Sequence, residues 1–166
     1  MGRCVEHQEL IPKSETPAQL PKGIVIQYYD RWPSEPKELN AGSLRRVLKN
    51  LREGKWENIF FTNDINFEQN FMQLESGGGL YALQFIQDNT GGSGEEAAYF
   101  TTYDPDYLGS GEETDIDCSD GQSIIFREDT TTDKEAVMTA MEYFVRTGKL
   151  WDGIPWRKVW QEWVEE

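Results

Sequence analysis

The chain has 166 residues with 37% hydrophobic content, enough to fold as one domain with a sizeable core. Its formal net charge of −14 at pH 7 argues against binding to nucleic acid or to an anionic membrane surface, because both attract Lys and Arg. No apolar run approaches the roughly 20 residues of a membrane span, and residues 1–19 lack the apolar core of a signal peptide, so a cytoplasmic protein is expected.

The negative charge is confined to the middle of the chain. Residues 56–126 contain fourteen acids and no Lys, Arg or His, whereas the remaining residues hold sixteen acids and sixteen Lys and Arg. A region of one sign costs self-repulsion and serves either solubility or the steering of a basic partner. Aromatic residues lie among these acids, and aromatic side chains dominate interface hot spots. We therefore expect a basic protein partner.

The first third of the chain predicts an irregular lead-in, a strand and a helix. Residues 1–22 contain three prolines and no clear period, so a lead-in is expected there and a single domain over 23–166. The β-branched and aromatic run 23–29 favours a strand. Residues 43–53 predict a helix capped by Ser43 and ended by Gly54. Its apolar side chains share one face: Leu44, Val47, Leu48 and Leu51.

The middle of the chain predicts short antiparallel strands. The candidate strands cover 58–62, 71–75, 80–87, 97–103 and 122–126. The glycines 77–79 predict a hairpin connection, and the polar, glycine-rich run 89–94 predicts a loop. Short strands joined by polar turns indicate a meander.

Two helices are expected at the C-terminal end. The first begins with a capping box of Thr132 and Glu135 and ends at Gly148. The second begins near Pro155, with apolar residues at helical spacing: Trp156, Val159, Trp160 and Trp163. The predicted fold class is α+β, an antiparallel meander packed by one helix from the N-terminal half and two C-terminal helices. The clustered tryptophans are expected to pack that last helix on the sheet, with exposed interface anchors as the alternative.

Residues typical of catalysis are scarce. His7 is the only histidine, so a nucleophile–histidine arrangement would have to use it. Cys4 and Cys118 are expected to be free thiols, and with His7 they do not form a zinc-site pattern. The glycine-rich runs lack the Lys-Ser/Thr of a phosphate loop. We therefore expect no enzyme activity and no cofactor.

Residues 104–115 partly match the pattern of a calcium-binding loop. Asp104, Asp106, Gly109 and Asp115 match positions one, three, six and twelve of the calcium-loop pattern. Leu108 stands where an oxygen ligand is needed, and the last position is Asp instead of Glu. An acidic surface loop is therefore the preferred interpretation.

The same loop is the predicted contact segment. Pro105, Gly109 and Gly111 indicate a loop that projects from the sheet. The residues expected to bind the basic partner combine tyrosine anchors with carboxylates: Tyr103, Asp104, Asp106, Tyr107, Glu112, Glu113, Asp115 and Asp117. The alternatives are a mobile loop without a partner, or contacts through residues 68–88 or the tryptophan-rich end.

The order of these features resembles the first-numbered immunity-protein family of bacterial polymorphic toxin systems. The resemblance covers about residues 40–160. It rests on the helix 44–51, the strand 59–63, the Gly-rich turn and aromatic strand 78–85, and the tyrosine strand 99–103. Its most specific part is Phe144-x-x-Thr147-Gly148, followed by Pro155-Trp156.

The resemblance implies an inhibitor that binds a cognate toxin domain, such as a nucleic-acid deaminase or nuclease. A toxin of this kind presents a basic groove, which carboxylates can occupy in place of phosphates. Two other hypotheses remain open. One is an acidic nucleic-acid mimic or adaptor that binds another DNA-binding protein; the other is a metal-dependent enzyme that uses the central acids.

Overall fold

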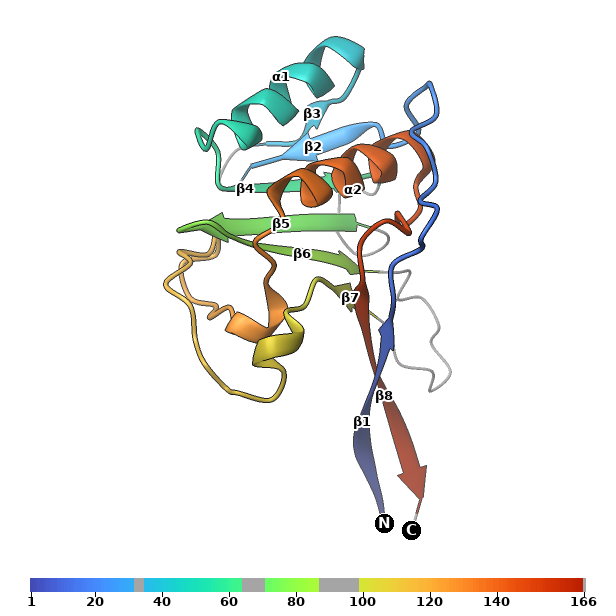
Figure 1. Cartoon of the computed structure of the whole chain (residues 1–166), viewed down its shortest axis with the longest axis vertical. Coiled ribbons are helices and arrows are strands. Elements are labelled where there is room, and N and C mark those ends of the chain that lie inside the picture. Colours follow the sequence, from blue (N-terminus) through green and yellow to red (C-terminus); the bar gives the residue numbers. More distant parts are fainter. Residues whose placement is uncertain (32–34, 64–70, 87–98, 166) are drawn as a thin grey trace.

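A computed structural model describes residues 1–31, 35–63, 71–86 and 99–165, and all statements below concern these residues. They form one antiparallel eight-stranded sheet and two α-helices, which confirms the α+β class (Figure 1). The strand order is β1-β8-β7-β6-β5-β4-β2-β3. In chain order the elements are β1 (Gly2–Ile11), β2 (Tyr28–Asp30), β3 (Lys37–Glu38), α1 (Ala41–Arg52), β4 (Asn58–Thr62), β5 (Phe71–Gly77), β6 (Leu80–Ile86), β7 (Tyr99–Thr101), α2 (Lys134–Thr147) and β8 (Trp156–Glu165).

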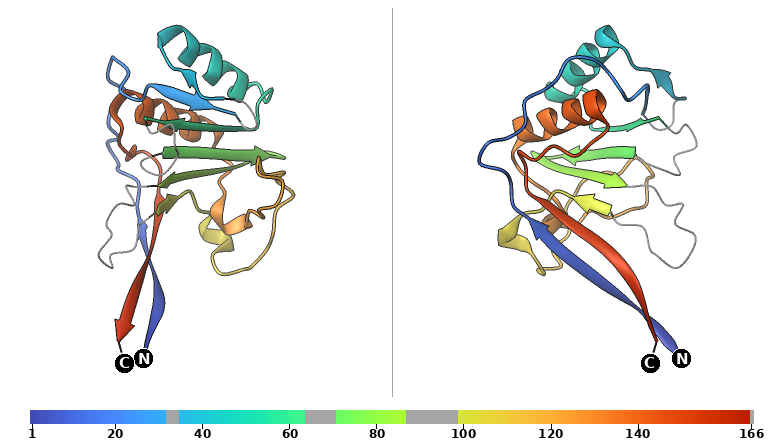
Figure 2. Two further views of the ribbon diagram at one scale, coloured as in Figure 1. Left: turned by 180° about the vertical axis from the view of Figure 1, so that it is seen from behind. Right: turned by 90° about the vertical axis from the view of Figure 1, so that its right-hand side faces the viewer.

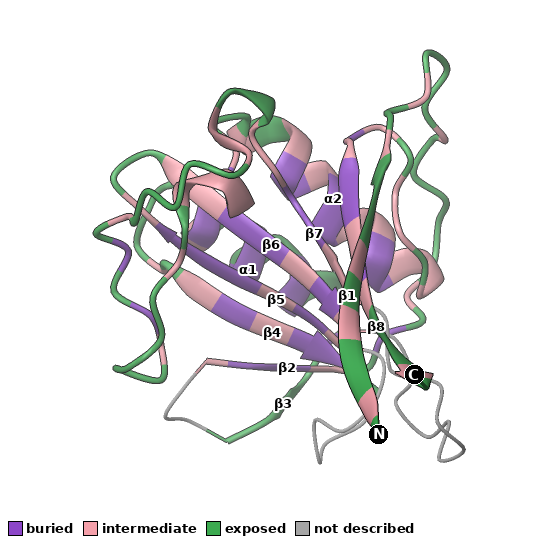
Figure 3. Cartoon of the chain, turned by 90° about the horizontal axis from the view of Figure 1, so that it is seen from below, coloured by how far each residue is buried: buried purple, intermediate pink, exposed green. Residues whose placement is uncertain are grey.

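The core lies between the sheet and the two helices. Alternate residues of β4, β5 and β6 pair across strands on the helix-facing side, such as Ile59 with Leu74 and Leu74 with Leu83. Phe144 of α2 is fully buried, with its ring 5.5 Å from that of Phe85 in an edge-on arrangement. Figure 3 looks onto the opposite face of the sheet, which we call the open face, with both helices behind it.

The predicted meander is correct for β4 to β7, which are neighbours in both the chain and the sheet. Gly78 and Gly79 have positive φ values of 61° and 83° and join β5 to β6, with Gly77 paired to Leu80. This backbone conformation suits a two-residue hairpin turn. The sequence therefore located this hairpin correctly. The predicted strand 97–103 is shorter, Tyr99–Thr101, while 97–98 and the predicted loop 89–94 lie outside the described residues.

Both long helices are where the sequence placed them, but each N-cap differs. Asn40, not Ser43, caps α1, accepting hydrogen bonds from the backbone N–H groups of Gly42 and Ser43. Asp133, not Thr132, caps α2 by accepting from Ala136 N–H. In both cases the side chain of a nearby Asn or Asp is better placed than the predicted hydroxyl to accept from the free N–H groups of the first turn. At the other end Gly148, with φ of 76°, ends α2 as predicted.

The prediction of a second C-terminal helix is wrong, because residues 156–165 form strand β8. The prediction of an irregular lead-in is also wrong in part, because residues 2–11 form strand β1, which pairs with all ten residues of β8. The two strands form a long ribbon with both chain ends at its tip (Figures 1 and 2). Tryptophan and valine favour strands, and their helical spacing was coincidental. The partner strand lies about 150 residues away, so no local pattern revealed the pairing.

Two other predicted strands differ. Of the run 23–29, only Tyr28 and Tyr29 enter β2, because the N–H groups of Val25 and Ile26 donate instead to the Val145 carbonyl near the end of α2. The run 122–126 is not a strand. It makes only an isolated bridge between Phe126 and Glu113, and Ile124 and Phe126 are exposed.

Candidate interaction surface

Residues 104–120, here called the acidic segment, lie between β7 and α2 at the end of the sheet that carries the β5–β6 turn. The segment begins with a 3-10 turn, η1 (Pro105–Tyr107). The chain then returns toward the sheet through a second 3-10 turn, η2 (Arg127–Asp129). The yellow and orange part of Figure 2 follows this path.

Arg127 fastens the start of the acidic segment. Its Nη1 lies 2.8 Å from Asp104 Oδ2, and its guanidinium carbon lies 4.1 Å from the centroid of the Tyr107 ring. Nη1 also donates to the Thr130 hydroxyl at 2.8 Å. The side chains of Arg127 and Asp104 are only 15% and 17% exposed, so water screens their attraction weakly. Two of the predicted contact residues, Asp104 and Tyr107, are therefore engaged in internal contacts.

Backbone hydrogen bonds hold the middle of the segment against residues 125–127. Thr114 N–H donates to the Ile125 carbonyl at 2.9 Å, and Arg127 N–H donates to the Glu112 carbonyl at 2.8 Å. The Thr114 hydroxyl also donates to the Ile125 carbonyl. Glu112 is thereby fixed through its backbone while its side chain stays exposed.

Beyond Thr114 the chain alternates like a strand. Ile116 and Cys118 are buried, whereas Asp115 and Asp117, which alternate with them, are exposed. The burial of every second residue turns the two carboxylates outward. Burial, together with the negative charge of Glu75, Asp120 and Asp117, raises the pKa of the Cys118 thiol to about 11.

Glu75 of β5 holds the far end of the acidic segment on the open face. It is 4% exposed, and its carboxylate accepts from the Ser119 N–H at 3.1 Å and from the Ser119 hydroxyl. Gln73 Nε2 donates to the same carboxylate at 3.1 Å. A cavity of about 80 Å³ lies beside Glu75, between the sheet and Ile125 and Asp129. Burying a carboxylate costs free energy, and these hydrogen bonds from neutral donors offset that cost for Glu75.

The turn after the acidic segment is held by its own side chains. Asp120 accepts from the N–H groups of Gln122 and Ser123 and from the Ser123 hydroxyl. These hydrogen bonds lower the pKa of Asp120 below its ordinary value.

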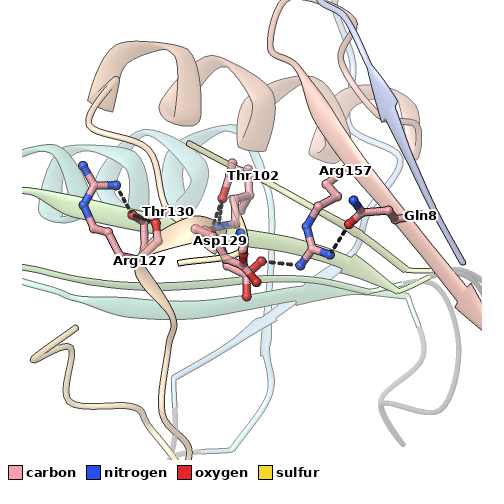
Figure 4. Close-up of polar contacts among 9 residues, drawn as sticks. Gln8, Thr102, Arg127, Asp129, Thr130 and Arg157 are labelled. Atoms are coloured by element: carbon pink, nitrogen blue, oxygen red, sulfur yellow. Dashed lines mark hydrogen bonds and ion pairs between the residues drawn. The ribbon is translucent and has the colours of Figure 1, made fainter. Parts of the chain in front are cut away.

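A partly buried ion pair ties η2 to β8 and β1, as Figure 4 shows. Arg157 Nη2 donates to Asp129 Oδ1 at 2.5 Å, and Nη1 donates to Gln8 Oε1 at 3.2 Å. Burial raises the pKa of Asp129, against the opposing effect of Arg157. Burial also works against the charge of Arg157, yet the hydrogen bond and attraction of Asp129 raise its pKa. Thr102 adds a hydrogen bond to the Asp129 carbonyl at 2.9 Å.

The structure separates the eight predicted contact residues into two sets. Three are half-buried: Tyr103, Asp104 and Tyr107. Five are exposed carboxylates: Asp106, Glu112, Glu113, Asp115 and Asp117. The supporting residues Arg127, Glu75 and Ser119 were missed. Arg127 had a visible signal as the first base after the acidic run, but nothing in the sequence paired Glu75 with Ser119.

Other candidate residues take structural positions. In the described part of the chain, no group of three or more His, Cys, Asp and Glu side chains could hold a metal ion. His7 Nε2 lies 2.8 Å from Glu162 Oε2, and its ring stacks on Trp160 with centroids 5.5 Å apart. Trp156 is buried in the core, whereas Trp163 is 55% exposed at the ribbon tip. Cys4 and Cys118 are free thiols.

The chain matches no known family model, no curated protein and no solved structure. Among the described residues, neither helix has the length and apolar character needed to cross a membrane.

Proposed function

We propose that this protein is an immunity protein that binds and neutralises a cognate bacterial toxin domain acting on nucleic acid, a deaminase or nuclease. The observation that carries the proposal is the row of exposed carboxylates on a segment fastened from within. Arg127 and Glu75 hold its two ends, while Asp115, Asp117 and the adjacent Glu112 face solvent. A preformed acidic surface loses less conformational entropy on binding than a mobile loop.

The chemistry of the partner follows from that surface. Carboxylates pair with the Lys and Arg that such a toxin uses to hold phosphates, and Arg does so in bidentate fashion. The acidic segment would cover the basic groove and exclude the nucleic acid. The same surface would serve an acidic mimic that binds another DNA-binding protein, so the identity of the partner separates the two hypotheses.

The test is co-expression in cells with the C-terminal domain of the toxin encoded directly upstream. We expect the wild-type chain to restore growth and to co-purify with that domain. The variant Asp115→Asn/Asp117→Asn should protect less at equal protein level. Glu15→Gln, which neutralises an exposed acid in the N-terminal part of the chain, is the matched control. Growth arrest despite abundant wild-type protein would reject the proposal.

A further inference from the structure

A pocket of about 190 Å³ opens where the β5–β6 turn meets the end of α1. Its walls include Trp56, Tyr81 and Glu57, and its floor includes the glycines 77–79. This volume is below the roughly 300–1,000 Å³ of pockets that hold small molecules or cofactors. It suits a single side chain from another protein.

The glycines keep the pocket open. A Cβ atom at Gly78 or Gly79 would have no other atom within 4 Å, so these two positions border free space. At Gly77 a Cβ atom would lie 3.2 Å from Glu57 Oε2, which places that carboxylate over the glycine floor. An incoming group can therefore reach the backbone and the Glu57 carboxylate together.

The walls have the chemistry of a cation site. Trp56 and Tyr81 are half-buried and Glu57 is exposed. One face of the Trp56 indole is occupied by the guanidinium of Arg31, whose central carbon lies 4.1 Å from the ring centroid. That contact shows that the ring accepts a cation, and it leaves the Tyr81 ring beside the Glu57 carboxylate for a second one. Aromatic faces beside a carboxylate attract a cation through ring quadrupole and charge together.

The surroundings add negative charge. The Cα atom of Ile116 lies 3.8 Å from the Cβ position of Gly77, so the exposed Asp115 and Asp117 on either side of Ile116 are close to the pocket. Two nearby bases are paired: Arg52 lies 3.3 Å from Glu135, and Lys55 lies 3.3 Å from Glu53. The C-terminal end of α1, which adjoins the pocket, also favours positive charge.

We infer that this pocket receives the guanidinium of an arginine from the basic partner and serves as the anchor of the interface. The inference rests on the proposed function for the identity of the partner. A planar guanidinium fits better than an ammonium, because it can stack on an aromatic ring while donating to Glu57. The acidic segment beside the pocket then supplies attraction, and the pocket supplies the buried contact that tight binding needs.

The test uses the full-length, ¹⁵N-labelled protein and two small probes. Nα-acetyl-arginine amide is titrated while NMR follows the Trp56 indole N–H and the backbone amides of residues 77–79. Nα-acetyl-citrulline amide is the neutral probe of nearly the same shape. We expect saturable shifts at these positions with the arginine probe, and markedly weaker shifts with the citrulline probe.

Glu57→Gln should weaken the arginine probe roughly two- to fivefold, the range for an exposed charge pair. The substitution keeps the backbone carbonyl of residue 57, which accepts a hydrogen bond from the Ser76 hydroxyl, so the local backbone should be unaffected. The control Glu15→Gln removes an equal charge from an exposed acid outside the acidic segment and should leave the pocket shifts intact. Equal shifts with citrulline, shifts confined to residues 112–117, or no effect of Glu57→Gln would overturn the inference. The toxin assay can fail while the arginine probe still binds, and the probe can fail to bind while the chain still protects against the toxin. The two proposals are therefore tested separately.

Discussion

Arg127 and Cys118 show how single residues shape the acidic segment from within. The guanidinium of Arg127 forms an ion pair with Asp104, and its planar face stacks on the Tyr107 ring. One side chain thereby holds part of the acidic loop in a fixed turn. Cys118 is a small buried group that faces inward next to the outward carboxylate of Asp117. Some acids of the segment, such as Asp104, therefore make internal contacts, whereas others, such as Asp115 and Asp117, form its exposed surface.

Replacing Arg127 by Gln should destabilise the protein by about 1–3 kcal/mol. The pair with Asp104 is mostly but not fully buried, so the cost falls between those of exposed and buried ion pairs. Urea unfolding followed by tryptophan fluorescence measures the change. Lys55→Gln breaks an exposed pair with Glu53 and should change stability by less than about 0.5 kcal/mol. An equal effect of both variants would contradict the role given to Arg127.

The two thiols should react at very different rates. Cys4 is exposed, whereas Cys118 is buried and its pKa is raised to about 11, so at pH 8 Cys118 has almost no thiolate. Mass spectrometry of a timed iodoacetamide reaction should show one fast addition, at Cys4. Since a raised thiol pKa favours the protonated native state, stability should also fall as pH rises from about 9 to 11. Fast labelling of Cys118 in the folded protein would show that the segment is not held closed.

At the scale of elements, β8 connects the two ends of the chain to the acidic segment. It pairs with β1 along ten residues and with β7 along three, and its Arg157 reaches Asp129 of η2. Val159 of β8 is 1% exposed, so the strand belongs to the sheet and not only to the ribbon. The first eleven residues therefore support the sheet and, through Gln8, the ion pair under the acidic segment.

Deleting residues 1–12 should lower the melting temperature by several degrees and broaden the transition. The deletion leaves one edge of β8 without its partner and removes Gln8 from Arg157. Circular dichroism during heating measures the change. An irregular lead-in would be dispensable, so unchanged melting of the deletion variant would favour that earlier interpretation over the observed strand.

Core and surface substitutions should separate stability from binding. Phe144→Ala removes a fully buried ring of α2 and should cost about 3–5 kcal/mol. The charge reversal Glu112→Lys/Glu113→Lys alters exposed side chains and should change stability by less than about 0.5 kcal/mol for each substitution, while it weakens toxin binding. Paired unfolding and pull-down measurements decide this. If the charge reversal unfolds the protein more readily than Phe144→Ala, the burial pattern described above is wrong.

The whole molecule separates its charges in space. The exposed bases of α1 lie on the helix side: Arg45, Arg46, Lys49 and Arg52. The acidic segment is held on the open face of the sheet, where Ser119 donates to Glu75, and its Ile116 comes near the C-terminal end of α1 beside Gly77. Such a separation orients the molecule in the field of a charged partner.

Association with a basic toxin domain should be fast and sensitive to salt. Exposed charges are screened beyond roughly 8 Å at physiological ionic strength, so added salt removes the long-range attraction. Stopped-flow fluorescence should show an association rate that falls steeply between low and high NaCl, with a smaller change in the dissociation rate. An association rate independent of salt would exclude electrostatic steering.

The sequence by itself determined the elements whose signals are local. Helices α1 and α2, strands β4 to β6 and the Gly78–Gly79 turn follow from patterns within about a dozen residues. The concentration of charge was equally visible, since it needs only the order of residues. Five of the eight predicted contact residues are exposed, because an acidic loop side chain stays in water unless a specific partner draws it inward.

Tertiary structure alone decided the rest. Residues 156–165 have both helical spacing and strand-favouring side chains, and only pairing with β1, some 150 residues earlier, settles the choice. Asp104 and Tyr107 look like surface residues until Arg127 covers them. Likewise Trp56 and Glu57, in the connection between α1 and β4, meet Tyr81 of β6 in a pocket only after the sheet has formed. Contacts between distant residues depend on register and packing, which no short stretch of sequence encodes.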